Sequence, residues 1–113
     1  WVAGFSFGAW VAMQLLMRRP EINGFVSVSP PANLRDFSFL APCPSSGLIV
    51  HGDKDNIASF DSAKILSEKL QKQKKVDIQF KSIKGADHFY ENFTDQFLST
   101  IDTYIKNTLN VLK

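Results

Sequence analysis

The order of short apolar runs and longer helix-like runs limits the fold of this chain more than any other feature. Strand-like runs cover residues 24–28, 47–50 and 76–80, and helix-like runs cover residues 9–19, 60–74 and 93–109. Residues 1–3 have the character of the end of a strand whose start lies outside the sequence. Strands that alternate with helices imply βαβ units. We therefore expect an α/β protein, a three-layer αβα sandwich around a mostly parallel sheet.

The individual runs also predict burial. Residues 47–50 are continuously apolar, which indicates a strand buried on both faces. Residues 76–80 alternate between apolar and polar, which is typical of a half-buried strand. Residues 9–19 are apolar on nearly every side, which predicts a helix buried all round. That helix should end near Arg19, because Pro20 follows two arginines.

Composition excludes several classes of protein. The chain is 44% hydrophobic and 21% charged, as in ordinary globular proteins, and its net charge of +2 gives no basis for binding nucleic acid. The longest apolar run, residues 10–17, is interrupted by Gln14 and is shorter than the roughly 20 residues of a membrane span. There is no signal-peptide pattern, and the single cysteine, Cys43, fits a reducing compartment. We expect a soluble cytoplasmic protein.

The first candidate site is Gly4-Phe5-Ser6-Phe7-Gly8, which matches the pattern G-x-S-x-G. It lies between a strand end and a helix start, where the nucleophile elbow of a hydrolase lies. Such a turn is so sharp that glycine is expected at both Gly4 and Gly8 to avoid collisions. Ser6 is then the candidate nucleophile, and the backbone N–H of Phe7 a candidate oxyanion donor. The alternative is that Ser6 is only a helix N-cap between packing glycines.

The second candidate site is His51-Gly52-Asp53-Lys54-Asp55, directly after the apolar strand. Functional groups gather at the carboxyl ends of parallel strands. A carboxylate there can accept a hydrogen bond from a histidine and fix its tautomer. A plain turn or helix cap is the alternative, and His51 is expected to be a packed structural residue and not the base.

The third candidate site is Gly85-Ala86-Asp87-His88-Phe89, which follows the predicted strand segment at residues 76–83. Histidine suits general base chemistry near neutral pH, so His88 is the candidate base and should reach Ser6. Asp87 is its neighbour in sequence and is expected to point elsewhere. The alternative is a surface histidine in a turn. The order serine, acid, histidine, each after a different strand, is the chain order of α/β-hydrolases.

On these three motifs the whole sequence resembles the α/β-hydrolase superfamily, and within it the small lidless enzymes of the dienelactone-hydrolase-like and esterase-like group. Dienelactone hydrolases proper use cysteine where this chain has Ser6. The family pattern H-G-x-x-D-x-[VI] assigns the catalytic acid to Asp55, with Asp53 as the fallback. The resemblance implies that residues 1–113 are the C-terminal half of a domain, with strands one to four outside the sequence.

The resemblance implies a serine hydrolase that acts on an ester, thioester or lactone through an acyl-enzyme, with Ser6, His88 and Asp55 as its triad. It implies no metal and no organic cofactor. A second oxyanion donor, beside the N–H of Phe7, would come from the part of the fold outside the sequence. The alternatives are a non-catalytic remnant or binding module of the same fold, and a small peptidase.

The expected partners follow from the same features. A small-molecule carbonyl substrate is expected, and neither nucleic acid nor a membrane. The strand at residues 1–3 should have an exposed edge, so we expect it to pair with the N-terminal half of the fold or to self-associate. Phe5, Phe7, Phe89 and Tyr90 lie near the candidate residues in sequence, and either an apolar pocket or an aromatic core would account for them.

Overall fold

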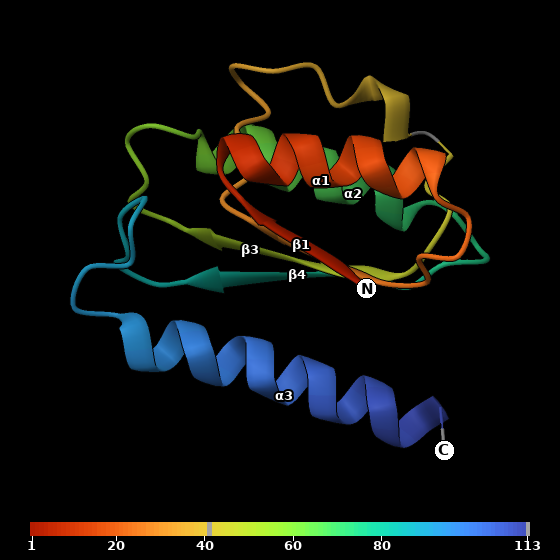
Figure 1. Cartoon of the computed structure of the whole chain (residues 1–113). Coiled ribbons are helices and arrows are strands. Elements are labelled where there is room, and N and C mark those ends of the chain that lie inside the picture. Colours follow the sequence, from red (N-terminus) through yellow and green to blue (C-terminus); the bar gives the residue numbers. More distant parts are fainter. Residues whose placement is uncertain (41, 113) are drawn as a thin grey trace.

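A four-stranded parallel sheet with the strand order β1-β2-β3-β4 organises the structure, a computed structural model that describes residues 1–40 and 42–112. The elements are β1 (Val2–Phe5), α1 (Phe7–Arg18), β2 (Phe25–Val28), the short 3₁₀ helix η1 (Ser38–Leu40), β3 (Gly47–Gly52), α2 (Phe60–Gln71), β4 (Ile78–Ile83) and α3 (Thr94–Leu112). Helices α1 and α2 cover one face of the sheet and α3 covers the other (Figure 1). This confirms the three-layer α/β fold.

Two apolar cores fill the space between the layers, because neighbouring residues of a strand point to opposite faces. On the side of α1 and α2, Phe25 and Ile49 pack with Met13 and Leu16 of α1. On the side of α3, strand residues that point to the opposite face pack with Tyr104 of that helix. The buried residues of this second core are Val26, Val28, Leu48, Val50, Ile83, Ala86, Tyr90 and Tyr104. All six residues of β3 are buried, as the continuous apolar run predicts.

Helix α1 is less buried than its sequence predicts. Its buried residues are Ala9, Ala12, Met13 and Leu16, all on one side. Apolar residues on its other side are exposed among the described residues: Val11 by 47%, Leu15 by 43% and Met17 by 40%. Within the described residues α1 contacts the sheet through one face only, so this part of the fold does not bury the helix all round.

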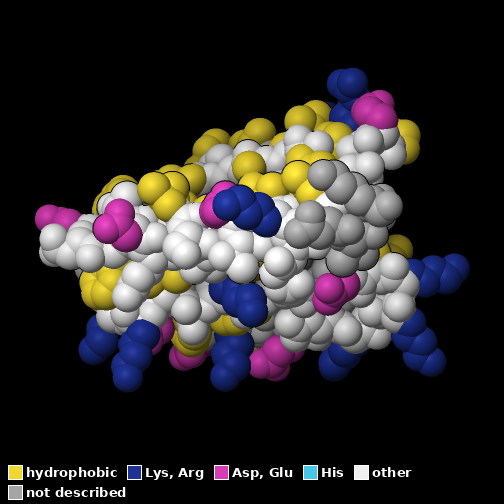
Figure 2. All heavy atoms as spheres, turned by 90° about the horizontal axis from the view of Figure 1, so that it is seen from below, with side chains coloured by type: hydrophobic (Ala, Val, Ile, Leu, Met, Phe, Trp, Pro, Cys, Tyr) yellow, Lys and Arg dark blue, Asp and Glu magenta, His cyan; other side chains and the backbone are white. Residues whose placement is uncertain are grey.

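Strand β4 runs from Ile78 to Ile83, within the strand segment predicted over residues 76–83 but extending beyond the alternating run at residues 76–80. Only its two end residues are buried, so the strict alternation predicted for residues 76–80 does not describe it. The reason is its place at the edge of the sheet, where it pairs with β3 alone. Figure 2 shows hydrophobic side chains gathered along one border of the molecule, with most lysines and arginines along the opposite border.

Candidate active site

The turn between β1 and α1 places Ser6 at the carboxyl end of the sheet. Ser6 has φ 57° and ψ −121°, a conformation that costs an L-residue about 1–3 kcal/mol. Its backbone N–H donates to the carbonyl of Val28 at 2.8 Å, which ties the strained turn to β2. Within the described residues its side chain makes no capping hydrogen bond, so a simple N-cap does not account for this serine.

The two glycines of the motif have different roles. A Cβ atom on Gly4 would collide with the backbone carbonyl of Gly8 and would lie 2.7 Å from the nitrogen of Ala9. A Cβ atom on Gly8 would meet no described atom within 4 Å. The expectation that both glycines prevent collisions is therefore right for Gly4 and wrong for Gly8. Gly4 allows the first turn of α1 to lie close to β1, whereas the described residues leave room for a side chain at Gly8.

His88 joins the serine to a carboxylate. Its Nε2 lies 2.9 Å from Oγ of Ser6, and its Nδ1 lies 2.7 Å from Oδ2 of Asp55. A carboxylate only accepts hydrogen bonds, so Nδ1 carries the proton and the lone pair of Nε2 accepts the serine hydroxyl. His88 is 3% exposed, so water has little access to either contact. The structure thus brings the three sequence-predicted side chains together from β1, β3 and β4.

The two neighbouring aspartates after β3 have separate partners. The side chain of Asp55 is fully buried, and its Oδ1 accepts the backbone N–H groups of Ile57 and Ala58, both at 2.8 Å. Asp53 is exposed, and its Oδ1 accepts the N–H of Gly85 at 2.6 Å. Asp55 therefore contacts the histidine, while Asp53 fastens the loop that carries it.

Asp87, the neighbour of His88 in sequence, points away from the imidazole, as expected. Its Oδ1 accepts the backbone N–H of Glu91 at 2.9 Å, so its role is to shape the loop after β4.

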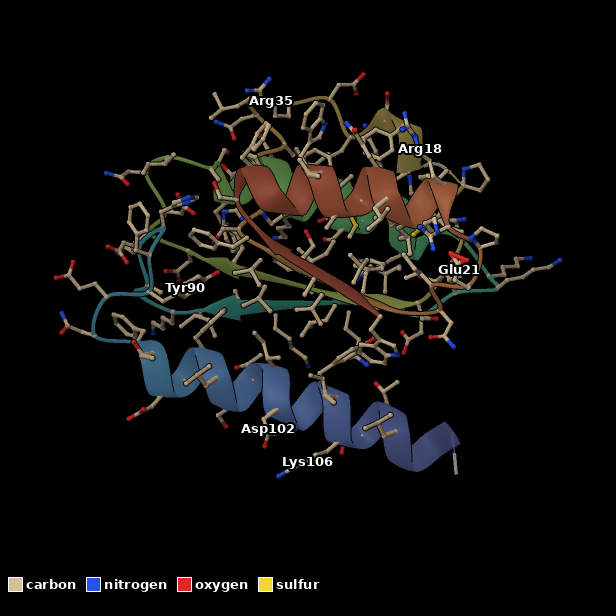
Figure 3. All side chains as sticks on the ribbon, viewed as in Figure 1. Arg18, Glu21, Arg35, Tyr90, Asp102 and Lys106 are labelled. Atoms are coloured by element: carbon tan, nitrogen blue, oxygen red, sulfur yellow. The ribbon has the colours of Figure 1, made fainter. Side chains whose placement is uncertain are left out.

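Tyr90 anchors that loop to the sheet, a role that the sequence analysis missed. Its hydroxyl lies 2.9 Å from Oγ of Ser29 and donates to the carbonyl of Val50 at 3.3 Å. Both Tyr90 and Ser29 are buried at positive φ, 57° and 51°. Burial raises the pKa of Tyr90 to about 12, so the hydroxyl keeps its proton for these contacts. Figure 3 shows Tyr90 at the end of the sheet where the strands finish.

Three of the four aromatic residues near the motifs border the site at the surface, and Tyr90 alone belongs to the core. The rings of Phe5 and Phe89 lie 5.1 Å and 5.0 Å from the imidazole of His88. Phe89 is 66% exposed, Phe7 52% and Phe5 42%. The ring of Phe7 instead packs against Trp10, at 5.5 Å between ring centres. We call Phe5 and Phe89 the aromatic rim.

The backbone N–H of Phe7 is the first of α1, and the first N–H groups of a helix have no partner within it. It directly follows Ser6, where a developing oxyanion would form.

In residues 1–40 and 42–112, no group of three or more His, Cys, Asp or Glu side chains could hold a metal ion. No helix in that part of the chain is long and apolar enough to cross a membrane.

A strained serine between strand and helix, followed in chain order by an acid and a histidine on a three-layer parallel sheet, defines an α/β-hydrolase. The chain belongs to the dienelactone hydrolase family, whose model matches residues 1–107.

The chain is also similar to individual proteins along most of its length. The chain is 52% identical over 108 residues to an uncharacterized protein, RP471, of Rickettsia prowazekii, which covers 92% of this chain and 45% of that protein. It is also 52% identical to ATU1826 of Agrobacterium tumefaciens, a proposed alpha/beta hydrolase of unknown function, with a TM-score of 0.95 over 97% of this chain and 50% of that one.

A third relative is XC6422 of Xanthomonas campestris, described as an a/b serine hydrolase without lid. It is 25% identical, with a TM-score of 0.80 over 93% of this chain and 45% of that one. The chain therefore spans about half the length of each of these relatives.

Proposed function

We propose that this chain carries the nucleophile, base and acid of a serine hydrolase that cleaves an ester, thioester or lactone. The observation that supports the proposal is the continuous series of hydrogen bonds from Oγ of Ser6 through His88 to Asp55, at 2.9 and 2.7 Å. His88 and the Asp55 side chain are buried while Ser6 is half-buried, and the histidine has the tautomer that a general base requires.

In the proposed reaction, Nε2 of His88 takes the hydroxyl proton of Ser6 as Oγ bonds to the substrate carbonyl carbon. The carbonyl electrons move to the oxygen, and the N–H of Phe7 stabilises that oxyanion. The intermediate collapses, the leaving oxygen or sulfur departs with the proton from His88, and an acyl-serine remains. Water then attacks the acyl carbon as Nε2 of His88 takes its proton. The bond from Oγ of Ser6 to the acyl carbon breaks, Oγ recovers the proton from His88, and the acid leaves. Asp55 stabilises the imidazolium in both steps.

The aromatic rim favours substrates with an apolar group beside the reacting carbonyl. Phe5 and Phe89 flank His88 and expose much of their rings, so an alkyl or aryl group bound there would cover apolar surface. No comparable feature of the described residues favours a peptide substrate over an ester.

We also propose that full activity needs a partner along β1. An apolar groove follows this strand, and its lining residues are Trp1, Val2, Ala3, Gly4, Phe5, Val26, Val28, Ile101 and Ile105. A further segment of chain or a second copy that paired there would lie beside Ser6 and could supply a second oxyanion donor. The absence of one such donor typically costs about 100- to 1000-fold in rate.

Labelling with a fluorophosphonate probe tests the function without requiring turnover. We expect the probe to form an adduct on Ser6, identified by mass spectrometry, and we expect Ser6→Ala and His88→Ala to lose it. The matched control is Ser99→Ala, an exposed serine on α3, which should be labelled like the wild type. Equal labelling of Ser6→Ala would place the nucleophile elsewhere, and a folded wild-type protein without labelling would favour the non-catalytic binding module.

A further inference from the structure

His51 lies beside the candidate acid, near the same carboxylate oxygen that His88 contacts. Its side chain and that of Asp55 are both fully buried, and its Nε2 lies 3.3 Å from the same Oδ2 atom that accepts the hydrogen bond of His88. The same Nε2 lies 2.7 Å from the backbone carbonyl of Ala58. The ring is therefore in contact with the acid, and packing at a strand end does not describe its full role.

The neighbours of this ring fix its tautomer. The carbonyl of Ala58 and the carboxylate of Asp55 both accept hydrogen bonds, so Nε2 of His51 must carry a proton to be stable beside them. Nδ1 is buried and has no hydrogen-bond partner among the described residues. A second proton on Nδ1 would be a buried donor without an acceptor, which is costly. The ring is thus held in its neutral, Nε2-protonated form.

The surroundings of the ring agree with a neutral state. The titratable groups that face His51 are Asp55 and His88, and from α2 it is covered by the aromatic ring of Phe60, at 6.0 Å between ring centres. Burial is the largest influence on the pKa of His51 and lowers it, against the opposing effects of Ala58 and Asp55.

The hydrogen bonds around Asp55 form a closed arrangement. Ala58 donates its N–H to Oδ1 of Asp55 and receives the Nε2–H of His51 at its carbonyl, while His51 also faces Oδ2. Rotation of the carboxylate would break contacts on both of its oxygens. Since a neutral donor adds no positive charge, the negative charge of Asp55 stays available to the imidazolium that forms on His88.

We propose that His51 is a positioning residue, a neutral ring whose Nε2–H holds the carbonyl of Ala58. It thereby fixes the turn whose N–H groups bind Asp55, so that Asp55 can orient His88. The inference rests on the proposed function for its kinetic consequence, but its structural content concerns two histidines alone. They are the only two histidines of the sequence, so each can be followed separately by NMR.

The first test is the ring nitrogen spectrum of the ¹⁵N-labelled wild-type protein. We expect His51 to show a protonated Nε2 and an unprotonated Nδ1, and to gain its second proton only at a lower pH than an ordinary histidine does. A protonated Nδ1 in the neutral ring, or a ring that becomes charged at the pH of an ordinary histidine or above, would overturn the proposal. This measurement does not depend on Ser6 being a nucleophile.

The second test compares His51→Leu, which removes the donor, with His51→Gln, whose amide can place an N–H near the same position. We expect His51→Leu to slow fluorophosphonate labelling of Ser6 by about 2- to 10-fold, the value of a neutral hydrogen bond, and to weaken the NMR signal of the His88 Nδ1 proton. His51→Gln should recover most of both. The wild-type labelling rate is the reference for each variant.

Each outcome of this comparison decides between positioning and packing. If folded His51→Leu keeps the labelling rate and the His88 signal while its thermal midpoint falls, His51 is only a packing residue. If folded His51→Gln recovers neither property, the donor role is wrong. If His51→Leu does not fold, the ring spectrum of the wild type decides. If the wild type is not labelled, the proposed function fails, and the His88 signal still decides the role of His51.

Discussion

Strands β1 and β3 both end at the candidate site, but their surroundings are opposite. β3 pairs with β2 and β4, and all six of its residues are buried. β1 pairs with β2 alone, and its residues alternate between half-buried and exposed. Asp55 follows the central strand and Ser6 follows the edge strand. The acid therefore has rigid support from three strands, whereas the serine depends on the turn itself.

This difference explains why the backbone of Ser6 needs so many local constraints. Its strained conformation is held by the hydrogen bond to Val28 and by the close approach of α1 to β1 at Gly4. No such strain occurs at Asp55, whose turn is stabilised by its own carboxylate. The three predictions that follow test this contrast.

The largest effect, on the rate at which Ser6 is labelled, is expected for a substitution in the turn after β3. Asp55→Asn should slow labelling of Ser6 by about 10⁴-fold, because an amide that donates to His88 favours the wrong tautomer. Asp53→Asn is the matched control, since its amide oxygen can still accept the N–H of Gly85. Labelling rates of both variants are the measurement. If Asp53→Asn were the slower of the two, the acid would be assigned to the wrong residue.

A smaller effect, on stability, is expected at the β1 turn. Gly4→Ala should lower the free energy of unfolding by about 3 kcal/mol, because its Cβ meets backbone that cannot move aside. Gly8→Ala should raise it by about 0.5–1 kcal/mol, because alanine is the better helix former and the space is open. Urea denaturation measures both. Equal losses would show that α1 packs against Gly8 as closely as against Gly4.

The smallest effect is the difference in unfolding free energy between truncating a side chain in β3 and truncating one in β1. Val50→Ala in β3 removes a fully buried side chain and should cost about 2 kcal/mol of unfolding free energy. Val2→Ala in β1 removes a half-buried one and should cost about 1 kcal/mol or less. Thermal and urea denaturation of the two variants check this. Equal costs would mean that the outer side of β1 is covered in solution, as the proposed partner along that strand requires.

Much of the fold could be predicted from the sequence, because strand and helix alternate and the apolar run of β3 is unambiguous. The burial of α1 could not be predicted, because a nearly all-apolar sequence does not tell which face contacts the sheet. The end of β4 at Ile83 was predicted, but its burial does not follow the alternation predicted for residues 76–80, since an edge strand has weaker apolar patterning than a central one.

For the site, the sequence predicted which side chains would meet, because each motif directly follows a strand and parallel strands end at one edge of the sheet. The contact of Tyr90 with Ser29 joins residues 61 positions apart, and no local pattern marks it. The contact of His51 with Asp55 is close in sequence, but its geometry depends on how the chain turns at Ala58. These contacts are set by tertiary structure.

The hydrogen bond between Ser6 and His88 joins residues 82 positions apart, which has a consequence for folding. The entropy lost in closing a loop grows with its length, so a contact of this span forms only after the intervening strands have paired. During synthesis, the residues from β1 to the loop after β4 must all emerge before the serine meets its histidine. A reagent that detects their pairing would therefore report that these four strands have assembled.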